Sequence, residues 1–113
     1  IMPELSTLKK ISYFDNKSLL IVDDDNPFRE RLARAMEKKG FEVTQAEGVK
    51  KGIESVKVRK PAFAVVDLRL NDGNGLEVVK ELQNSNSNYT FYKIRDVIIF
   101  MYACMFQRYD YGK

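Results

Sequence analysis

The chain has no histidine and a single cysteine, Cys104, among its 113 residues. One cysteine excludes an internal disulfide framework and fits a reducing compartment. Without histidine, zinc sites, haem sites and cysteine–histidine catalytic schemes have almost no ligands available. Any metal site should therefore hold a hard cation of the Mg²⁺ or Mn²⁺ type on oxygen ligands.

Long apolar runs are also missing. No stretch approaches the roughly 18 apolar residues that a membrane-spanning helix requires, and residues 1–17 lack the apolar core of a signal peptide. These absences predict a cytoplasmic location and no membrane partner. The net charge of +3 is spread along the chain and gives little support for nucleic-acid binding. Length and a hydrophobic content of 44% fit one globular domain with one core.

Two short apolar runs end in acidic residues. Leu19–Val22 is followed by Asp23, Asp24 and Asp25, and Phe63–Val66 is followed by Asp67. Such runs are typical of strands buried on both faces of a parallel sheet, and ligands bind beyond the carboxyl ends of those strands. Neighbouring strands would bring Asp23, Asp24 and Asp67 into one pocket. Three close carboxylates need a counter-charge, which predicts a Mg²⁺ site.

The first helix is predicted to start at Asn26 as N-cap, with Pro27 at the first helical position, and to end at Gly40. Helical spacing predicts an apolar stripe against the sheet and a solvated basic face. The stripe consists of Phe28, Leu32, Ala35 and Met36. The basic residues on the remaining faces are Arg29, Arg31, Arg34, Lys38 and Lys39.

The pattern up to residue 83 alternates strands and helices. We expect strands at Ser18–Asp23, Phe41–Ala46 and Phe63–Val66, helices at about 48–58 and from Leu76, and a turn-rich loop at Asn71–Gly75. This βαβαβα order with short connections predicts an α/β fold with a doubly wound parallel sheet. We divide the chain into a lead-in, residues 1–17, and one domain, residues 18–113.

The character of the chain changes at residue 84. Asn84–Asn88 is a polar linker, and Val97–Phe106 is apolar throughout. Periodicity leaves this apolar segment open between a buried strand and a buried helix, although its first residues favour a strand. No further strand-and-helix pair follows, so we expect the sheet to be incomplete at its C-terminal end.

The chain resembles a two-component response regulator receiver domain (the CheY-like family) in two stretches, LLIVDDDNPFRERLARAMEKKGFEV and FAVVDLRLNDGNGLEVV. The segment DLRLNDGNGL resembles in particular the redox-responding global regulators of the RegA/PrrA type. The resemblance covers about residues 18–83 and implies a flavodoxin-like fold. Residues 84–113 are then a divergent or truncated tail, for which a shifted reading frame is one explanation.

The resemblance also implies roles for individual residues. Asp67 matches the phosphoacceptor, which receives a phosphoryl group from a sensor histidine kinase. Asp23 and Asp24 match the acidic pair that holds Mg²⁺ together with Asp67, Asp24 directly and Asp23 mainly through water. The backbone carbonyl of Arg69 stands at the place of a further metal ligand, and Asp25 has a supporting role. The resemblance further implies a possible homodimer on phosphorylation and contact with DNA only through an output domain absent from this chain.

Three positions depart from the family. Asn71 replaces a common proline, no serine or threonine stands near Arg95–Val97 where the family has one, and the family lysine would fall beyond residue 113. We therefore expect phosphotransfer with impaired signal propagation, in a signalling domain whose only catalysis is its own phosphorylation. Two alternatives remain: a non-phosphorylated pseudo-receiver that acts as an interaction module, and a Mg²⁺-dependent phosphohydrolase with Asp25 as the acid/base two residues after Asp23.

Overall fold

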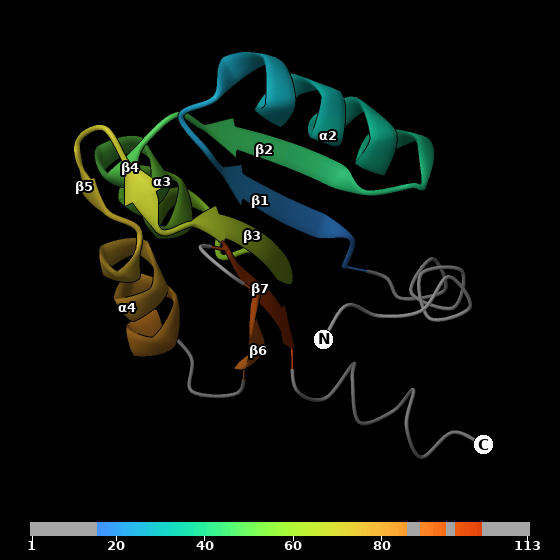
Figure 1. Ribbon diagram of the computed structural model, residues 1–113. Coiled ribbons are helices and arrows are strands. Elements are labelled where there is room, and N and C mark those ends of the chain that lie inside the picture. The colour runs from blue at the N-terminus through green and yellow to red at the C-terminus, as the bar shows by residue number, and fades with distance from the viewer. Residues whose placement is uncertain (1–15, 86–88, 95–96, 103–113) are drawn as a thin grey trace.

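The structure, a computed structural model, describes residues 16–85, 89–94 and 97–102, with side chains described for 16–84, Lys93 and Val97 (Figure 1). Residues 1–15 of the predicted lead-in, and Cys104 within 103–113, lie outside the described residues. In the described part, no helix is long and apolar enough to cross a membrane. The elements are β1 (Ser18–Val22), α2 (Asn26–Lys38), β2 (Glu42–Ala46), α3 (Val49–Val58), β3 (Phe63–Asp67), β4 (Arg69–Leu70), β5 (Gly73–Asn74), α4 (Leu76–Ser85), β6 (Tyr89–Ile94) and β7 (Val97–Tyr102).

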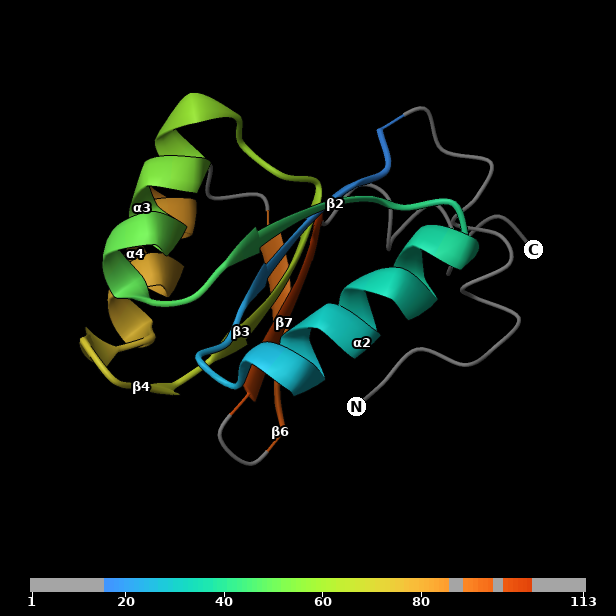
Figure 2. The same ribbon diagram turned by 90° about the horizontal axis from the view of Figure 1, so that it is seen from above.

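The main sheet has the order β2-β1-β3-β7-β6 and lies between two helical layers. Helix α2 covers one face, and α3 and α4 cover the other (Figures 1 and 2). Strand β1 lies between β2 and β3 and runs parallel to both, with Leu19 opposite Val43 on one side and Phe63 on the other. The prediction of a doubly wound parallel sheet is confirmed, and the order 2-1-3 is that of flavodoxin-like folds.

The core explains why β1 is apolar at every position. Leu20 and Val22 belong to the cluster that includes residues of α3 and α4, such as Val56 and Leu82. Leu19 and Ile21 belong to a second cluster on the α2 side. Because both faces of β1 are covered, its four apolar side chains are each at most 3% exposed.

The buried face of α2 differs from the predicted stripe. Arg29 and Ala33 are buried, and Leu32 and Met36 pack against the core in part. Phe28 is 43% exposed and Ala35 is also exposed, so the prediction was wrong for both residues. The prediction that Arg29 is solvated was wrong as well, because its guanidinium finds hydrogen-bond acceptors beneath the helix.

The start of α2 is shifted by one residue from the prediction. Asp25, and not Asn26, is the N-cap, and its Oδ1 accepts a hydrogen bond of 3.0 Å from the N–H of Phe28. The Asn26 side chain accepts a hydrogen bond from Arg29 instead. Gly40 follows the helix with a φ of +99°, as expected for a glycine beyond a helix end.

The last two strands form an antiparallel hairpin. Strand β7 pairs antiparallel with β3 and with β6, so the undecided segment from Val97 is a strand as far as Tyr102. This end of the sheet differs from the doubly wound pattern. Only residues 95 and 96 separate β6 from β7, whereas a parallel crossover needs about a dozen residues.

Candidate metal centre

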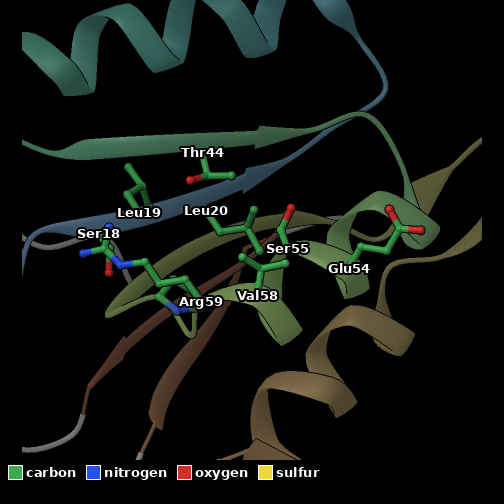
Figure 3. Close-up of a pocket in the computed structure, with 9 residues that line it drawn as sticks. Ser18, Leu19, Leu20, Thr44, Glu54, Ser55, Val58 and Arg59 are labelled. Atoms are coloured by element: carbon green, nitrogen blue, oxygen red, sulfur yellow. The ribbon is translucent and has the colours of Figure 1, made fainter.

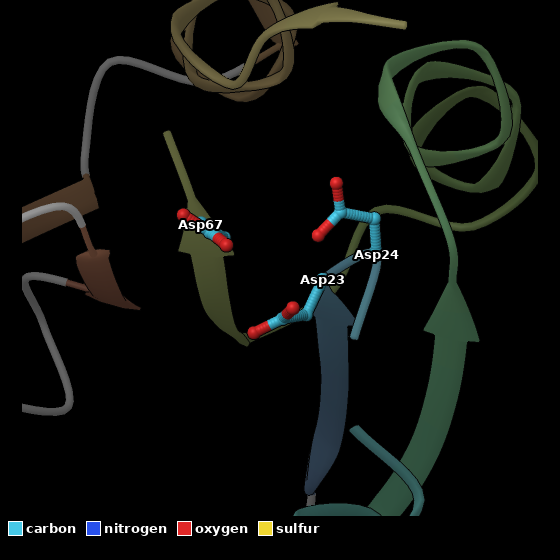
Figure 4. Close-up of side chains that lie close together, drawn as sticks. All are labelled: Asp23, Asp24 and Asp67. Carbon is cyan, nitrogen blue, oxygen red and sulfur yellow. The ribbon is translucent and has the colours of Figure 1, made fainter. Parts of the chain in front are cut away.

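Three carboxylates meet beyond the ends of β1 and β3. The pairing of Val22 with Val66 places the residues that follow these two strands side by side. Asp23, Asp24 and Asp67 each offer a carboxylate oxygen, and these oxygens lie within 4.8 Å of one another (Figure 4). The convergence expected from the two apolar strands is therefore present in the fold.

Burial and mutual repulsion make this cluster receptive to a cation. Asp23 is 8% exposed, while Asp24 and Asp67 are half-buried. Burial raises the pKa of Asp23; the hydrogen bond from the Asp25 N–H opposes this, and the negative charges of Asp67, Asp24 and Asp25 raise the pKa further. The donor set is oxygen only, and the half-exposed side leaves access for water. Both features fit Mg²⁺, which prefers oxygen and usually keeps several waters.

Local hydrogen bonds shape the turn between β1 and α2. The N–H of Asp23 donates to the carbonyl of Ala46 over 3.1 Å, which continues the pairing of β1 with β2 by one residue. The N–H of Asp25 donates to Asp23 Oδ1 over 2.9 Å. Since the Asp25 carboxylate in turn caps α2, the helix start holds the acidic turn in place.

Arg29 supports this turn from below and was missed by the sequence reasoning. Its side chain, 9% exposed, donates from Nη1 to the Asp23 carbonyl over 2.8 Å and to Asn26 Oδ1 over 2.7 Å. Its Nε donates to Gln45 Oε1 of β2 over 2.9 Å. A signal was available, because Arg29 lies one helical turn before Leu32 and Ala33 on the face that is buried.

The connection after β3 passes close to Asp67. The N–H of Arg69 donates to Asp67 Oδ1 over 3.0 Å, so Arg69 lies in the expected turn, where its carbonyl is the proposed further ligand. Strands β4 and β5 form a small hairpin that confirms the predicted turn-rich loop. Gly75 closes this connection: its N–H donates to the Leu68 carbonyl over 2.9 Å, and a Cβ there would collide with the carbonyl oxygen of Asp67.

Asp72 ties the same hairpin to α3. Its carboxylate accepts hydrogen bonds from the N–H groups of Val49 and Lys50 over 2.8 and 3.2 Å, and these bonds lower the pKa of Asp72. The carboxylate lies so close to Gly48 that a Cβ there would be 2.6 Å from Asp72 Oδ1. One hint was present in the sequence. Gly48, the N-cap of α3, brings no capping side chain, so the first N–H groups of the helix need an acceptor from elsewhere.

The expected absence of a hydroxyl beside Asp67 can be examined at one position. Val97 is the ladder partner of Asp67 and is half-buried, while residues 95–96 lie outside the described part. Thr90 of β6 pairs with Met101, which pairs with Phe63 at the start of β3. The threonine of this hairpin is thus at the opposite end of the sheet from Asp67.

A pocket of about 320 Å³ lies at the opposite end of β1 (Figure 3). It lies between the start of β1, the middle of β2 and the end of α3, and its lining includes Ser18, Leu20, Thr44, Ser55 and Arg59. Arg59 also forms an ion pair of 3.3 Å with Glu42. The pocket shares no residue with the acidic cluster, so it is no part of the site described above.

Comparisons with known proteins agree with this arrangement. The chain matches the response regulator receiver domain family over residues 19–99. It is 62% identical over 68 residues to the photosynthetic apparatus regulatory protein RegA of Rhodobacter capsulatus, covering 60% of this chain and 37% of RegA. It is 57% identical over 68 residues to the acid tolerance regulatory protein ActR of Rhizobium meliloti, covering 60% of this chain and 35% of ActR.

One solved structure is similar in both fold and sequence. It is a crystal structure of a response regulator protein from Burkholderia pseudomallei that contains a phosphorylated aspartic acid, a calcium ion and citrate. The TM-score is 0.60 at 30% identity, over 64% of this chain and 42% of that one. The chain spans little more than a third of the length of RegA and ActR. The match over residues 19–99 and the parallel β2-β1-β3 sheet place this chain in the response regulator receiver domain family.

Proposed function

We propose that Asp67 is the phosphoacceptor of a two-component phosphorelay, and that a sensor histidine kinase is the donor. A carboxylate oxygen of Asp67 attacks the phosphorus of a phosphohistidine, and an acyl phosphate bond forms as the P–N bond breaks. The electron pair of that bond leaves with the donor imidazole, which takes up a proton. The observation that supports this assignment is the position of Asp67, at the carboxyl end of β3 and within 4.8 Å of two further carboxylates.

The metal in this proposal is Mg²⁺, held by Asp23, Asp24, Asp67 and the backbone carbonyl of Arg69. When bound, it would neutralise the charge of the incoming phosphoryl group. The chain's own contribution is orientation: the hydrogen bond from the Arg69 N–H leaves the other oxygen of Asp67, Oδ2, as the candidate nucleophile. A calcium ion and a phosphorylated aspartic acid occur together in the Burkholderia relative, which is consistent with a divalent cation and an acidic acceptor in one site.

The two alternatives stand differently against the structure. The phosphohydrolase alternative requires Asp25 as acid/base, but its Oδ1 caps α2 by accepting from Phe28. The pseudo-receiver alternative draws support from Val97, a residue without a hydroxyl beside Asp67. We therefore retain the proposal that phosphotransfer occurs while the signal is passed on poorly. Regulation of transcription from the cytoplasm, through a DNA-binding segment outside this chain, and a homodimer formed on phosphorylation extend the proposal.

Incubation with Mg²⁺ and acetyl phosphate, followed by intact-mass measurement, tests the proposed function. The wild type should gain one phosphoryl group, and Asp67→Ala should gain none. Addition of EDTA should abolish the adduct. Glu47→Gln, which changes an exposed acid in the turn before α3, should retain it. Absence of the adduct from the wild type would favour the pseudo-receiver, and an equal adduct on Asp67→Ala would refute the assignment of Asp67. Repeated turnover of a phosphomonoester would point to the phosphohydrolase.

A further inference from the structure

We propose that Arg29 is a positioning residue for the acidic turn, and that it sets the affinity of the site for Mg²⁺ without touching the ion. The inference rests on the proposed function only in taking Asp23 and Asp24 as metal ligands. Arg29 lies in the first turns of α2 and is buried, although it carries a full positive charge. Among the described residues it forms no ion pair with a carboxylate within 4.0 Å.

A buried guanidinium with neutral partners needs a reason, because burying a charge costs free energy unless its donors are satisfied. The partners of Arg29 come from three consecutive parts of the fold. They are the carbonyl of Asp23 in the acidic turn, the side chain of Asn26 in α2 and the side chain of Gln45 in β2. The planar fork of donors therefore joins the turn, the helix and the edge strand at fixed distances.

The bond to the Asp23 carbonyl bears directly on the site. That carbonyl belongs to the peptide group between Asp23 and Asp24, and a peptide group is rigid. Fixing its oxygen fixes the direction of the N–Cα bond of Asp24, and this Cα carries the Asp24 side chain. The other side of the turn is fixed by the Asp25 N–H bond to Asp23 Oδ1. Arg29 thus orients two metal-binding carboxylates from underneath, as outer partners of metal ligands commonly do.

Matched substitutions on one helix separate positioning from stability. We compare Arg29→Met, which keeps the apolar stem, and Arg29→Lys, which keeps the charge, with Arg31→Met on the exposed face of α2. Gln45→Leu removes the Nε acceptor alone. For each variant of the 113-residue chain we measure Mg²⁺ binding by isothermal titration calorimetry. We also measure the Mg²⁺ concentration that half-saturates the rate of adduct formation with acetyl phosphate.

We expect Arg29→Met to weaken Mg²⁺ binding about 10- to 100-fold, the usual effect of losing an outer partner of a metal ligand. The maximal rate at saturating Mg²⁺ should remain within about threefold of the wild type, since the ion restores the ligand geometry once it is bound. Arg29→Lys should recover part of the affinity because one ammonium donor still reaches a carbonyl. Arg31→Met should behave as the wild type.

Unchanged Mg²⁺ affinity in Arg29→Met, or an equal loss in Arg31→Met, would overturn the inference. A purely structural role would lower the amount of active protein without moving the half-saturating Mg²⁺ concentration, and that result would overturn it too. If Arg29→Met does not fold, Arg29→Lys and Gln45→Leu decide by the same measurement. A wild type that binds Mg²⁺ but takes no phosphoryl group refutes the proposed function alone, while the calorimetric comparison still decides the role of Arg29.

Discussion

The turn after β1 and the connection after β3 bring carboxylates to one place by different means. The first turn consists of three residues, 23–25, and side-chain hydrogen bonds hold it: Arg29 donates to the Asp23 carbonyl, and the Asp25 carboxylate caps α2. The second connection relies on backbone fit, because Gly75 packs against the carbonyl of Asp67. It is then joined to α3 through Asp72. We infer that steric substitutions should damage the second connection most, whereas the first should respond to changes in hydrogen bonding.

The largest effect is expected at Gly75. Gly75→Ala places a Cβ against the backbone at Asp67 and Leu68, which cannot yield as a flexible side chain would, so we expect a loss of about 3 kcal/mol in the free energy of unfolding. Urea denaturation measures the loss. Gly40→Ala is the control: its φ is also positive but no atom lies within 4 Å, so its cost should be only about 1 kcal/mol. Equal costs would contradict the close-packed second connection.

Mg²⁺ should stabilise the fold through both segments together. At 100 times its dissociation constant, a ligand that binds only the folded state adds about 2.7 kcal/mol to the free energy of unfolding. Asp24→Asn in the first turn and Asp67→Asn in the second should each abolish most of this gain, measured by thermal unfolding with and without Mg²⁺. Glu30→Gln, on the exposed face of α2, should keep it. If either Asp variant kept the gain, one segment alone would hold the ion.

The cap of α2 should have a smaller effect. Asp25→Ala removes the acceptor for the Phe28 N–H and should cost about 1 kcal/mol, measured by urea denaturation in Mg²⁺-free buffer. Asp25→Ser keeps a capping oxygen while it removes a negative charge beside Asp23, so it should be close to the wild type or more stable. An effect of Asp25→Ser as large as that of Asp25→Ala would show that the charge, and not the cap, matters.

The two segments should respond to acid with opposite signs. The folded-state pKa of Asp72 is lowered from 3.8. The stability that ionised Asp72 adds to the fold is therefore fully present above pH 3.8 and is lost as pH falls through the lowered pKa. The folded-state pKa of Asp23 is raised from 3.8, so the protonated form is favoured by folding and stability declines as pH rises through the raised pKa. In Mg²⁺-free buffer, Asp72→Asn should therefore lose stability relative to the wild type as pH rises from acid, and Asp23→Asn should gain. Urea denaturation over a pH series checks both signs.

The sequence was sufficient to predict the acidic cluster, because each step of the prediction depended only on the local pattern of apolar and acidic residues. Two apolar runs predicted buried parallel strands, and adjacent parallel strands bring their ends together. The positions of Asp23, Asp24 and Asp67 follow from that alone. The end of the sheet could not be predicted in the same way, since an apolar segment such as Val97–Tyr102 pairs in either direction, and the direction depends on the short connection that precedes it.

The supporting residues were harder to predict because their partners lie elsewhere in the chain. The sequence alone predicts a solvated Arg29, because its acceptor Gln45 lies in β2, 16 residues further along the chain. The sequence alone predicts that Asp72 is only a turn residue. Its role as hydrogen-bond acceptor for the N-terminus of α3 depends on residues 22 to 23 positions earlier in the chain. Helical periodicity also wrongly predicted that Phe28 is buried. The spacing of apolar residues carries no information about hydrogen-bond acceptors beneath the helix, and these acceptors are what allow Arg29 to be buried there.

The most direct test of the account is to locate the phosphoryl group. Borohydride reduces an aspartyl phosphate to homoserine, so peptide mapping after treatment with Mg²⁺, acetyl phosphate and borohydride identifies the modified position. We expect homoserine at position 67 of the wild type and none in an EDTA-treated sample. Homoserine at position 23 or 24, or the absence of any modification despite bound Mg²⁺, would contradict it.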